Sequence, residues 1–142
     1  MIKIGIVYAT KTKHSKKLAE AIGGLLNTKA ENVSSNPVMK DIDLLFVVGG
    51  IYAGESLPEL LKYIGLLDGK EIRKVALITS CASKKQKQDQ VRSLLTNKGI
   101  EVVDEMVCQG SFLFMGIGHP NKADIEQAVS YAKRLVDGLN QR

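Results

Sequence analysis

The chain has 142 residues, of which 44% are hydrophobic and 25% charged, and its formal net charge is +5 at pH 7. These values are typical of one soluble globular domain with a single sizeable core. No apolar run reaches the ~20 residues that span a bilayer, and the opening run, residues 2–9, is too short for a secretory signal. We therefore expect a cytoplasmic protein with a single domain over residues 1–142 and no membrane span.

Apolar, β-branched runs recur along the chain. Four strong runs, at 2–8, 44–50, 74–80 and 101–107, and a weaker one at 30–33 predict five strands. The strong runs lack a two-residue alternation of apolar and polar side chains. This is the pattern of strands that are buried on both faces of a sheet.

Helical patterns lie between most of these strands, at residues 15–27, 57–67, 87–99 and 121–139. The expected N-caps are Ser15, Ser56 and Asn121. Pro58 suits a first helical turn, and Gly99 suits the position that follows a last turn.

The alternation of strands and helices predicts an α/β fold. Right-handed crossovers place parallel strands in one sheet with helices on both faces. Residues 34–43 are too short and too proline-broken for a full helix, so we expect a single turn there. In such a sheet, ligands bind beyond the carboxyl ends of the strands. The loops expected to form a site are residues 9–15, 49–56, 80–86 and 108–120.

The first of these loops, ATKTKHS at 9–15, is polar and basic and leads directly into a helix. Backbone N–H groups at a helix start, together with the helix dipole, attract anions. The hydroxyls of Thr10, Thr12 and Ser15 can each donate to a phosphate oxygen. The loop has neither the GxxxxGK[ST] nor the GxGxxG pattern, and it lacks the clustered acids of a phospho-receiver site. The alternative interpretation is a solvated, capped turn.

The second loop, GGIYAGESLP at 49–58, is rich in glycine around one aromatic residue. Gly49, Gly50 and Gly54 let the backbone approach a flat ligand or adopt a positive φ. The ring of Tyr52 can stack on such a ligand. The alternative is a tyrosine that packs beneath its own loop.

Three segments together resemble the flavodoxin family. In VYATKTKHSKKLAEAI, Thr10, Thr12 and Ser15 match the hydroxyl positions of the flavodoxin phosphate loop, while Lys13 and His14 replace its usual glycine and asparagine. DLLFVVGGIYAGESLPELLKYI is similar to the second flavin-contacting segment of flavodoxins and of menaquinone-linked protoporphyrinogen oxidases. CQGSFLFMGIGHPNKADIEQAVSYAKRL is similar to the closing segment of flavodoxin-like proteins from anaerobic microbes.

The resemblance implies a flavodoxin-like three-layer sandwich, a five-stranded parallel sheet of order 2-1-3-4-5 and one non-covalently bound FMN. It also implies that the first loop holds the phosphate, that Tyr52 lies against the ring, and that residues 80–83 contact its pyrimidine edge. The expected cofactor-binding residues are Thr10, Lys11, Thr12, Lys13, His14, Ser15, Gly50, Ile51, Tyr52, Ala53, Gly54, Ser80, Cys81, Ala82 and Ser83. Two features depart from the family, because this chain has no tryptophan and is basic.

The lysines gather on the loops that would surround the flavin. Lys11, Lys13, Lys16 and Lys17 follow the first strand, and Lys84, Lys85 and Lys87 follow the fourth. Two basic groups on one rim predict an acidic redox partner protein. No aromatic residues are interleaved with these lysines, so we do not expect nucleic-acid binding. We expect a monomer.

The leading functional hypothesis is an FMN-binding electron carrier that shuttles electrons between protein partners. One alternative is an FMN-dependent quinone reductase or protoporphyrinogen dehydrogenase, although loops 9–15 and 80–86 contain no carboxylate for acid–base chemistry. Another is a flavin-free interaction domain on the same fold. The sequence predicts no catalytic residue and no metal site. The long apolar loop at 108–120 either covers the edge of the core or faces the flavin or a partner.

The two cysteines, Cys81 and Cys108, end neighbouring strands of the predicted sheet and have no CxxC spacing. Their spacing argues against a disulfide scaffold or a zinc site. A redox pair between them requires Cα atoms within ~4.4–6.8 Å of each other. Because the cytosol keeps thiols reduced, we favour two free thiols.

Overall fold

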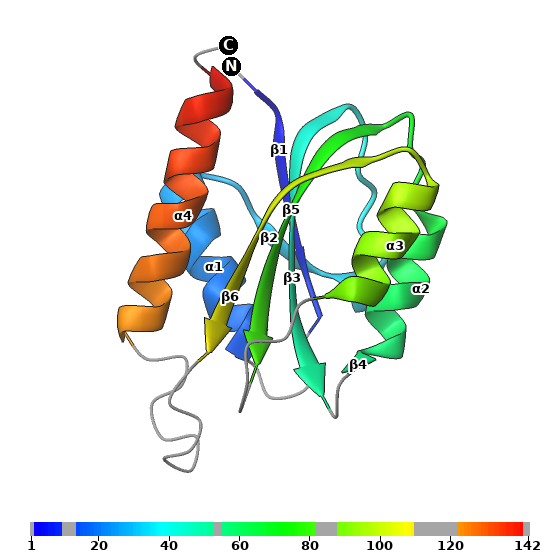
Figure 1. Cartoon of the computed structure of the whole chain (residues 1–142). Coiled ribbons are helices and arrows are strands. Elements are labelled where there is room, and N and C mark those ends of the chain that lie inside the picture. The colour runs from blue at the N-terminus through cyan, green and yellow to red at the C-terminus, as the bar shows by residue number, and fades with distance from the viewer. Residues whose placement is uncertain (1, 10–13, 53–54, 82–87, 110–121, 141–142) are drawn as a thin grey trace.

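The computed structural model describes residues 2–9, 14–52, 55–81, 88–109 and 122–140, with the backbone alone at 14, 51–52, 55, 80–81, 108–109 and 122–124 (Figure 1). Its centre is a parallel sheet of β1 (Ile4–Tyr8), β2 (Ala30–Asn32), β3 (Ile42–Tyr52), β5 (Ile72–Cys81) and β6 (Glu101–Gln109). These strands lie in the order β2-β1-β3-β5-β6. The predicted order 2-1-3-4-5 is therefore confirmed. The unpredicted β4 (Glu55–Ser56) pairs antiparallel with the end of β3.

Helices cover both faces of the sheet and complete three layers (Figure 1). One face carries α1 (His14–Leu26) and α4 (Lys122–Asn140), and the other carries α2 (Pro58–Leu66) and α3 (Asp89–Asn97). The segment between β2 and β3 contains one 3-10 turn, η1 (Val33–Ser35), as predicted. No helix within the described ranges is long and apolar enough to cross a bilayer.

β1, β3 and β5 contain unbroken apolar runs because both faces of the sheet are buried there. In β3, Leu45 and Val47 pack in the cluster under α2 and α3, whereas Leu44, Phe46 and Val48 pack in the cluster under α1 and α4. Successive side chains of a strand point to opposite faces. The middle positions of a central strand are therefore apolar on both faces, and the two-residue alternation disappears.

Two helix starts differ from the prediction. α1 begins at His14, so Ser15 lies inside the first turn instead of capping it. Ser56 belongs to β4, and the N-cap of α2 is Leu57, which makes no side-chain capping bond. Pro58 begins α2 as predicted, and Gly99 follows α3 with a φ of +78°. Asn121 lies outside the described residues.

Candidate functional site

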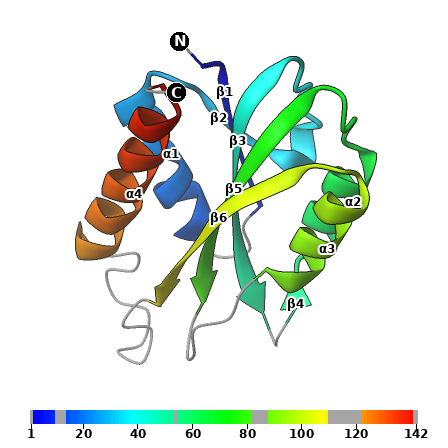
Figure 2. The ribbon, with the colours of Figure 1, turned by 45° about the horizontal axis from the view of Figure 1, so that its top comes forward.

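The carboxyl ends of the parallel strands meet at one edge of the sheet, which we call the carboxyl edge (Figure 2). The last residues of β1, β3, β5 and β6 are Tyr8, Tyr52, Cys81 and Gln109. The register places Gly50 beside Ser80, and Ser80 beside Cys108. Two predicted cofactor-contacting segments, at the end of β3 and at the end of β5, are therefore neighbours in space.

The described residues include part of the predicted cofactor site. The backbone of His14, Ser15, Gly50, Ile51, Tyr52, Ser80 and Cys81 lies at the carboxyl edge. Eight predicted residues lie outside the described ranges: Thr10, Lys11, Thr12, Lys13, Ala53, Gly54, Ala82 and Ser83. Their contacts remain predictions, and so does the stacking role of the Tyr52 side chain.

Ser15 lies in the first turn of α1, directly after the loop that follows β1. Its side chain is fully buried, and its Oγ has no hydrogen-bond partner among the described residues. An unpaired buried hydroxyl costs about 1–3 kcal/mol. The first turn of a helix also presents free N–H groups and the positive end of the helix dipole. This chemistry suits an anionic ligand group.

Other buried polar atoms at the carboxyl edge also lack partners among the residues that the structure describes. Five such side-chain atoms occur in the part of the chain that the structure describes, and four of them belong to this edge: Ser15 Oγ, Ser56 Oγ, Thr79 Oγ1 and Gln88 Oε1. The fifth is the hydroxyl of Tyr131, in α4. Because leaving a buried polar group unpaired is costly, we expect the four to find partners in the adjoining loops or in a bound ligand.

The backbone at Gly49 makes close contact with other protein residues. A Cβ at this position would lie 2.8 Å from Leu60 Cδ2 and 2.9 Å from Gln88 Oε1. Both atoms belong to the α2 and α3 side of the sheet. Packing against Leu60 and Gln88 is therefore sufficient to require glycine at position 49, and its contact with a flat ligand stays a prediction. Gly50, the next residue of β3, is buried beside Ser80 and keeps that predicted role.

A buried polar cluster beside these strand ends was not predicted from the sequence. Gln88 precedes α3 and is 0% exposed, and the Glu105 side chain is 3% exposed and pairs with Arg92. Glu105 was a detectable signal, because an acidic residue within a buried strand needs a cationic or hydrogen-bonding partner. The partner itself lies on another element.

Two tyrosines have phenol groups that resist ionisation. Burial, followed by the charge of Glu31, raises the pKa of Tyr63 to about 12. Burial, followed by the charges of Asp104 and Glu105, raises the pKa of Tyr131 well above its usual value. Neither phenol is suited to act as an acid or base near neutral pH.

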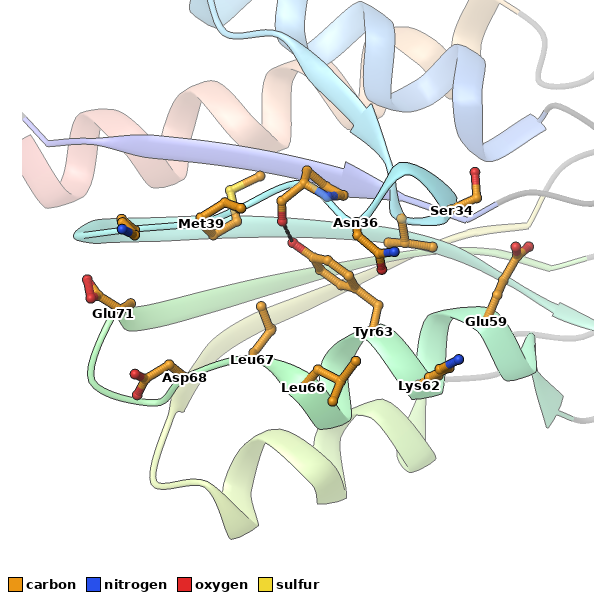
Figure 3. A pocket seen from close by; sticks show the side chains of 14 residues that line it. Ser34, Asn36, Met39, Glu59, Lys62, Tyr63, Leu66, Leu67, Asp68 and Glu71 are labelled. Carbon is orange, nitrogen blue, oxygen red and sulfur yellow. Dashed lines mark hydrogen bonds between the residues drawn. The ribbon is translucent and has the colours of Figure 1, made fainter.

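Tyr63 lines a separate hollow of about 670 Å³ on the flank of the molecule (Figure 3). The hollow lies between α2 and the segment that connects η1 to β3, and its apolar lining includes Met39 and Leu67. The Tyr63 hydroxyl donates to the carbonyl of Pro37 at 2.6 Å across it. None of the predicted cofactor-binding residues that the structure describes lines this hollow.

The two cysteines lie on neighbouring strands, β5 and β6, and are offset by one residue in the register. Cys108 pairs with Ser80, whereas Cys81 pairs with Gln109. The two cysteines are therefore not directly opposed across β5 and β6, and the pairing gives no support to a redox pair between them.

Solved structures with the same architecture match nearly the whole chain. A short-chain flavodoxin associated with a non-canonical PDU bacterial microcompartment has a TM-score of 0.71 and 21% identity, with 97% of this chain and 99% of that chain covered. The chain has a flavodoxin-like fold. A Fusobacterium nucleatum flavodoxin variant bound to flavin mononucleotide gives a TM-score of 0.64 and 18% identity, over 94% of each chain.

The same fold also occurs in an enzyme among these neighbours. An azoreductase of Bacillus anthracis has a TM-score of 0.69 and 14% identity, with 94% of this chain and 100% of that chain covered. By sequence, an uncharacterised protein of Methanocaldococcus jannaschii is 29% identical over 138 residues, covering 87% of this chain and 91% of the relative. No family model matches the chain.

Proposed function

We propose that this protein binds FMN at the carboxyl edge and carries electrons between protein partners. The observation that carries the proposal is Ser15, whose buried hydroxyl lacks a partner among the described residues in the first turn of α1. The flavodoxin-like fold and the flavodoxins among its neighbours support a flavin as the ligand. The residues present at this edge fit such a group.

The roles of the residues follow from their places at the carboxyl edge. Ser15 and the first-turn N–H groups of α1 would hold the phosphate, together with Thr10 and Thr12 of the preceding loop. The ring would lie at the neighbouring ends of β3 and β5, where Gly50 pairs with Ser80 and Tyr52 ends β3. When bound, FMN supplies the capacity to accept and release electrons. The protein supplies binding, orientation and shielding from water.

The partner is proposed to be acidic. Lys16 and Lys17 lie in the first turns of α1, and Lys17 is exposed to solvent. With the lysines on the two adjoining loops they would form a basic rim around the flavin. Complementary charge mainly raises the association rate, and salt screens it over about 8 Å at 0.15 M. Electron transfer to the partner should therefore slow as salt rises.

A flavin-dependent reductase is the second candidate, because the azoreductase among the fold neighbours shows that this architecture also serves an enzyme. Turnover of a quinone or azo compound with a reduced donor would favour it. The flavin-free interaction domain is the third candidate. It predicts a purified protein without visible absorption and without affinity for added FMN.

A flavin titration of Ser15→Ala tests the proposal. Removing a hydrogen bond to a charged phosphate should weaken FMN binding about 10- to 100-fold and leave riboflavin, which has no phosphate, nearly unaffected. The ligand-free variant should be at least as stable as the wild type, because an unpaired buried hydroxyl has been removed. Ser130→Ala is the matched control, since Ser130 is exposed on α4. Equal weakening of FMN and riboflavin would place the phosphate elsewhere.

A further inference from the structure

We infer that the start of α3 positions β4, β5 and β6 relative to one another at the proposed flavin site, an inference that rests on the proposed function. Gln88, Gln90 and Arg92 bind β5, β4 and β6 through their side chains or backbone. We call these three residues and Glu105 the α3 latch. The latch lies where the segments 53–54 and 82–87 return to the described fold.

Gln88 binds two strands of the sheet at the start of α3. It is the first described residue after 82–87, and it is completely buried. Its Nε2 donates to the carbonyl of Ile78 at 3.1 Å, which joins it to β5, the strand that precedes the same loop. Its backbone N–H donates to Glu105 Oε2 at 2.9 Å. Gln88 therefore joins the start of α3 to both β5 and β6.

Gln90 connects the start of α3 to β4. Its Oε1 accepts the backbone N–H of Ser56 at 3.1 Å, and Ser56 belongs to β4, which follows segment 53–54. β4 in turn pairs with the end of β3, on the other side of that segment. Figure 2 shows the first turn of α3 close to β4 and to the ends of β3 and β5. β4 and β5 are thus both tied to the start of α3.

Arg92 and Glu105 hold that turn against the sheet. The Glu105 side chain is 3% exposed, and its two oxygens accept from the Gln88 backbone N–H and from the Arg92 guanidinium. Leu60 and the Gln88 side chain also leave no room for a side chain at Gly49. The latch is therefore packed on the strand that leads into the second loop as well as on β5 and β6.

The environment of a flavin ring at these strand ends would change with the distance between them. Small shifts of the strand ends would alter hydrogen bonds to a bound ring, and such bonds tune the flavin's electronic properties. We therefore assign Gln88 and Gln90 as positioning residues that set the flavin environment without touching it.

The test breaks only the bond between α3 and β4. Gln90→Ala removes the acceptor of the Ser56 N–H, Gln90→Glu retains a carboxylate oxygen that can accept it, and Gln127→Ala is a matched control on the exposed face of α4. Hydrogen exchange of the ligand-free protein should become about 2- to 10-fold faster at residues 55–57 and 88–90 in Gln90→Ala, the factor expected from one lost hydrogen bond. Gln90→Glu should restore the wild-type rates.

The decisive readout is the flavin itself. In fully FMN-loaded protein, Gln90→Ala should shift the visible absorption bands and the midpoint potential, whereas Gln90→Glu and Gln127→Ala should not. A wild type that binds FMN, with a Gln90→Ala variant of unchanged spectrum and potential, would overturn the positioning role and leave the proposed function intact. A wild type that binds no FMN would overturn both, so the two failures are distinguishable.

Discussion

The polar groups at the two ends of the sheet differ in their burial and in their hydrogen-bond partners. At the amino ends of the strands, Arg73 forms ion pairs with Asp43 at 2.7 Å and Asp41 at 3.2 Å, and the Asp43 side chain accepts the Lys3 backbone N–H at 2.7 Å. The Asp41 N–H is in turn bound by Glu71 at 3.0 Å. We call these five residues the amino edge. Its polar groups satisfy one another in solvent.

At the carboxyl edge, buried polar atoms lack partners among the described residues, from Ser15 to Gln88. The difference is one of burial, because the amino-edge ion pairs involve side chains that are 32–74% exposed. Water can satisfy an exposed group, whereas a buried one requires a protein or ligand partner. One end of the sheet is therefore complete by itself, whereas the other needs partners from the adjoining loops or from the proposed ligand.

The largest effect should come from Glu105→Ala at the carboxyl edge. It removes the acceptor of both Gln88 N–H and Arg92, and a bond to a charged group contributes about 1.5–3 kcal/mol. Partial exposure of Arg92, at 39%, places the expected loss of unfolding free energy toward the lower end of that range. Glu101→Ala, on the exposed start of β6, should change stability by less than about 0.5 kcal/mol. Equal losses in urea denaturation would contradict the role of Glu105.

Gly49→Ala should have the next largest effect. The new methyl group would meet Leu60 and Gln88 at under 3 Å, and overpacking of this kind typically costs about 1–3 kcal/mol. Gly65→Ala is the matched control, because a Cβ at Gly65 meets nothing within 4 Å and alanine favours a helix. Thermal unfolding should show a lower Tm for the first variant and an unchanged or higher Tm for the second. A neutral Gly49→Ala would show that the strand end is loosely packed.

Tyr63, on the flank between the two edges, should make stability depend on alkaline pH. Its pKa is raised from about 10 to about 12 in the folded protein, so the fold favours the neutral phenol. This contribution is fully present below pH 10 and is lost as the pH rises toward 12. Tyr63→Phe should reduce the stability at pH 8, through loss of the bond to Pro37, and should lose less stability between pH 10 and 12. Parallel pH profiles for the two proteins would refute this assignment.

The smallest effect should come from Arg73→Met at the amino edge. Exposed ion pairs contribute about 0–1 kcal/mol and are screened by salt. The variant should therefore lose little unfolding free energy, less still at high salt, and its FMN affinity should be unchanged. A loss of FMN affinity comparable to that of Ser15→Ala would erase the distinction between the two edges.

The fold was predictable because its signals are local and repeated. The unbroken apolar runs at 44–50 and 74–80 indicated strands buried on both faces, and the strand–helix alternation indicated the crossovers. Helix starts were harder to predict. Ser56 before Leu57 and Pro58 has the sequence of a capped helix start, yet it pairs with β3 in a strand that is only two residues long. Tertiary pairing overrode the local capping signal.

The candidate site was predictable only in part. Ser15 was assigned to the phosphate loop from its place after a strand, and its burial could not be seen without the packing of α1 on the sheet. The α3 latch was missed because its bonds join residues on different elements, such as Gln88 with Glu105 and Gln90 with Ser56. Such contacts leave no periodic pattern in the sequence.

Hydrogen exchange with and without FMN tests the difference between the two edges most directly. Because a ligand that binds the folded state suppresses local opening, FMN should slow exchange at the carboxyl edge, in residues 14–17, 55–57 and 88–92. Exchange at the amino edge, in residues 3 and 41–43, should be unchanged, and riboflavin should protect residues 14–17 less than FMN does. Protection that is absent, or that is equal at both edges, would contradict the account.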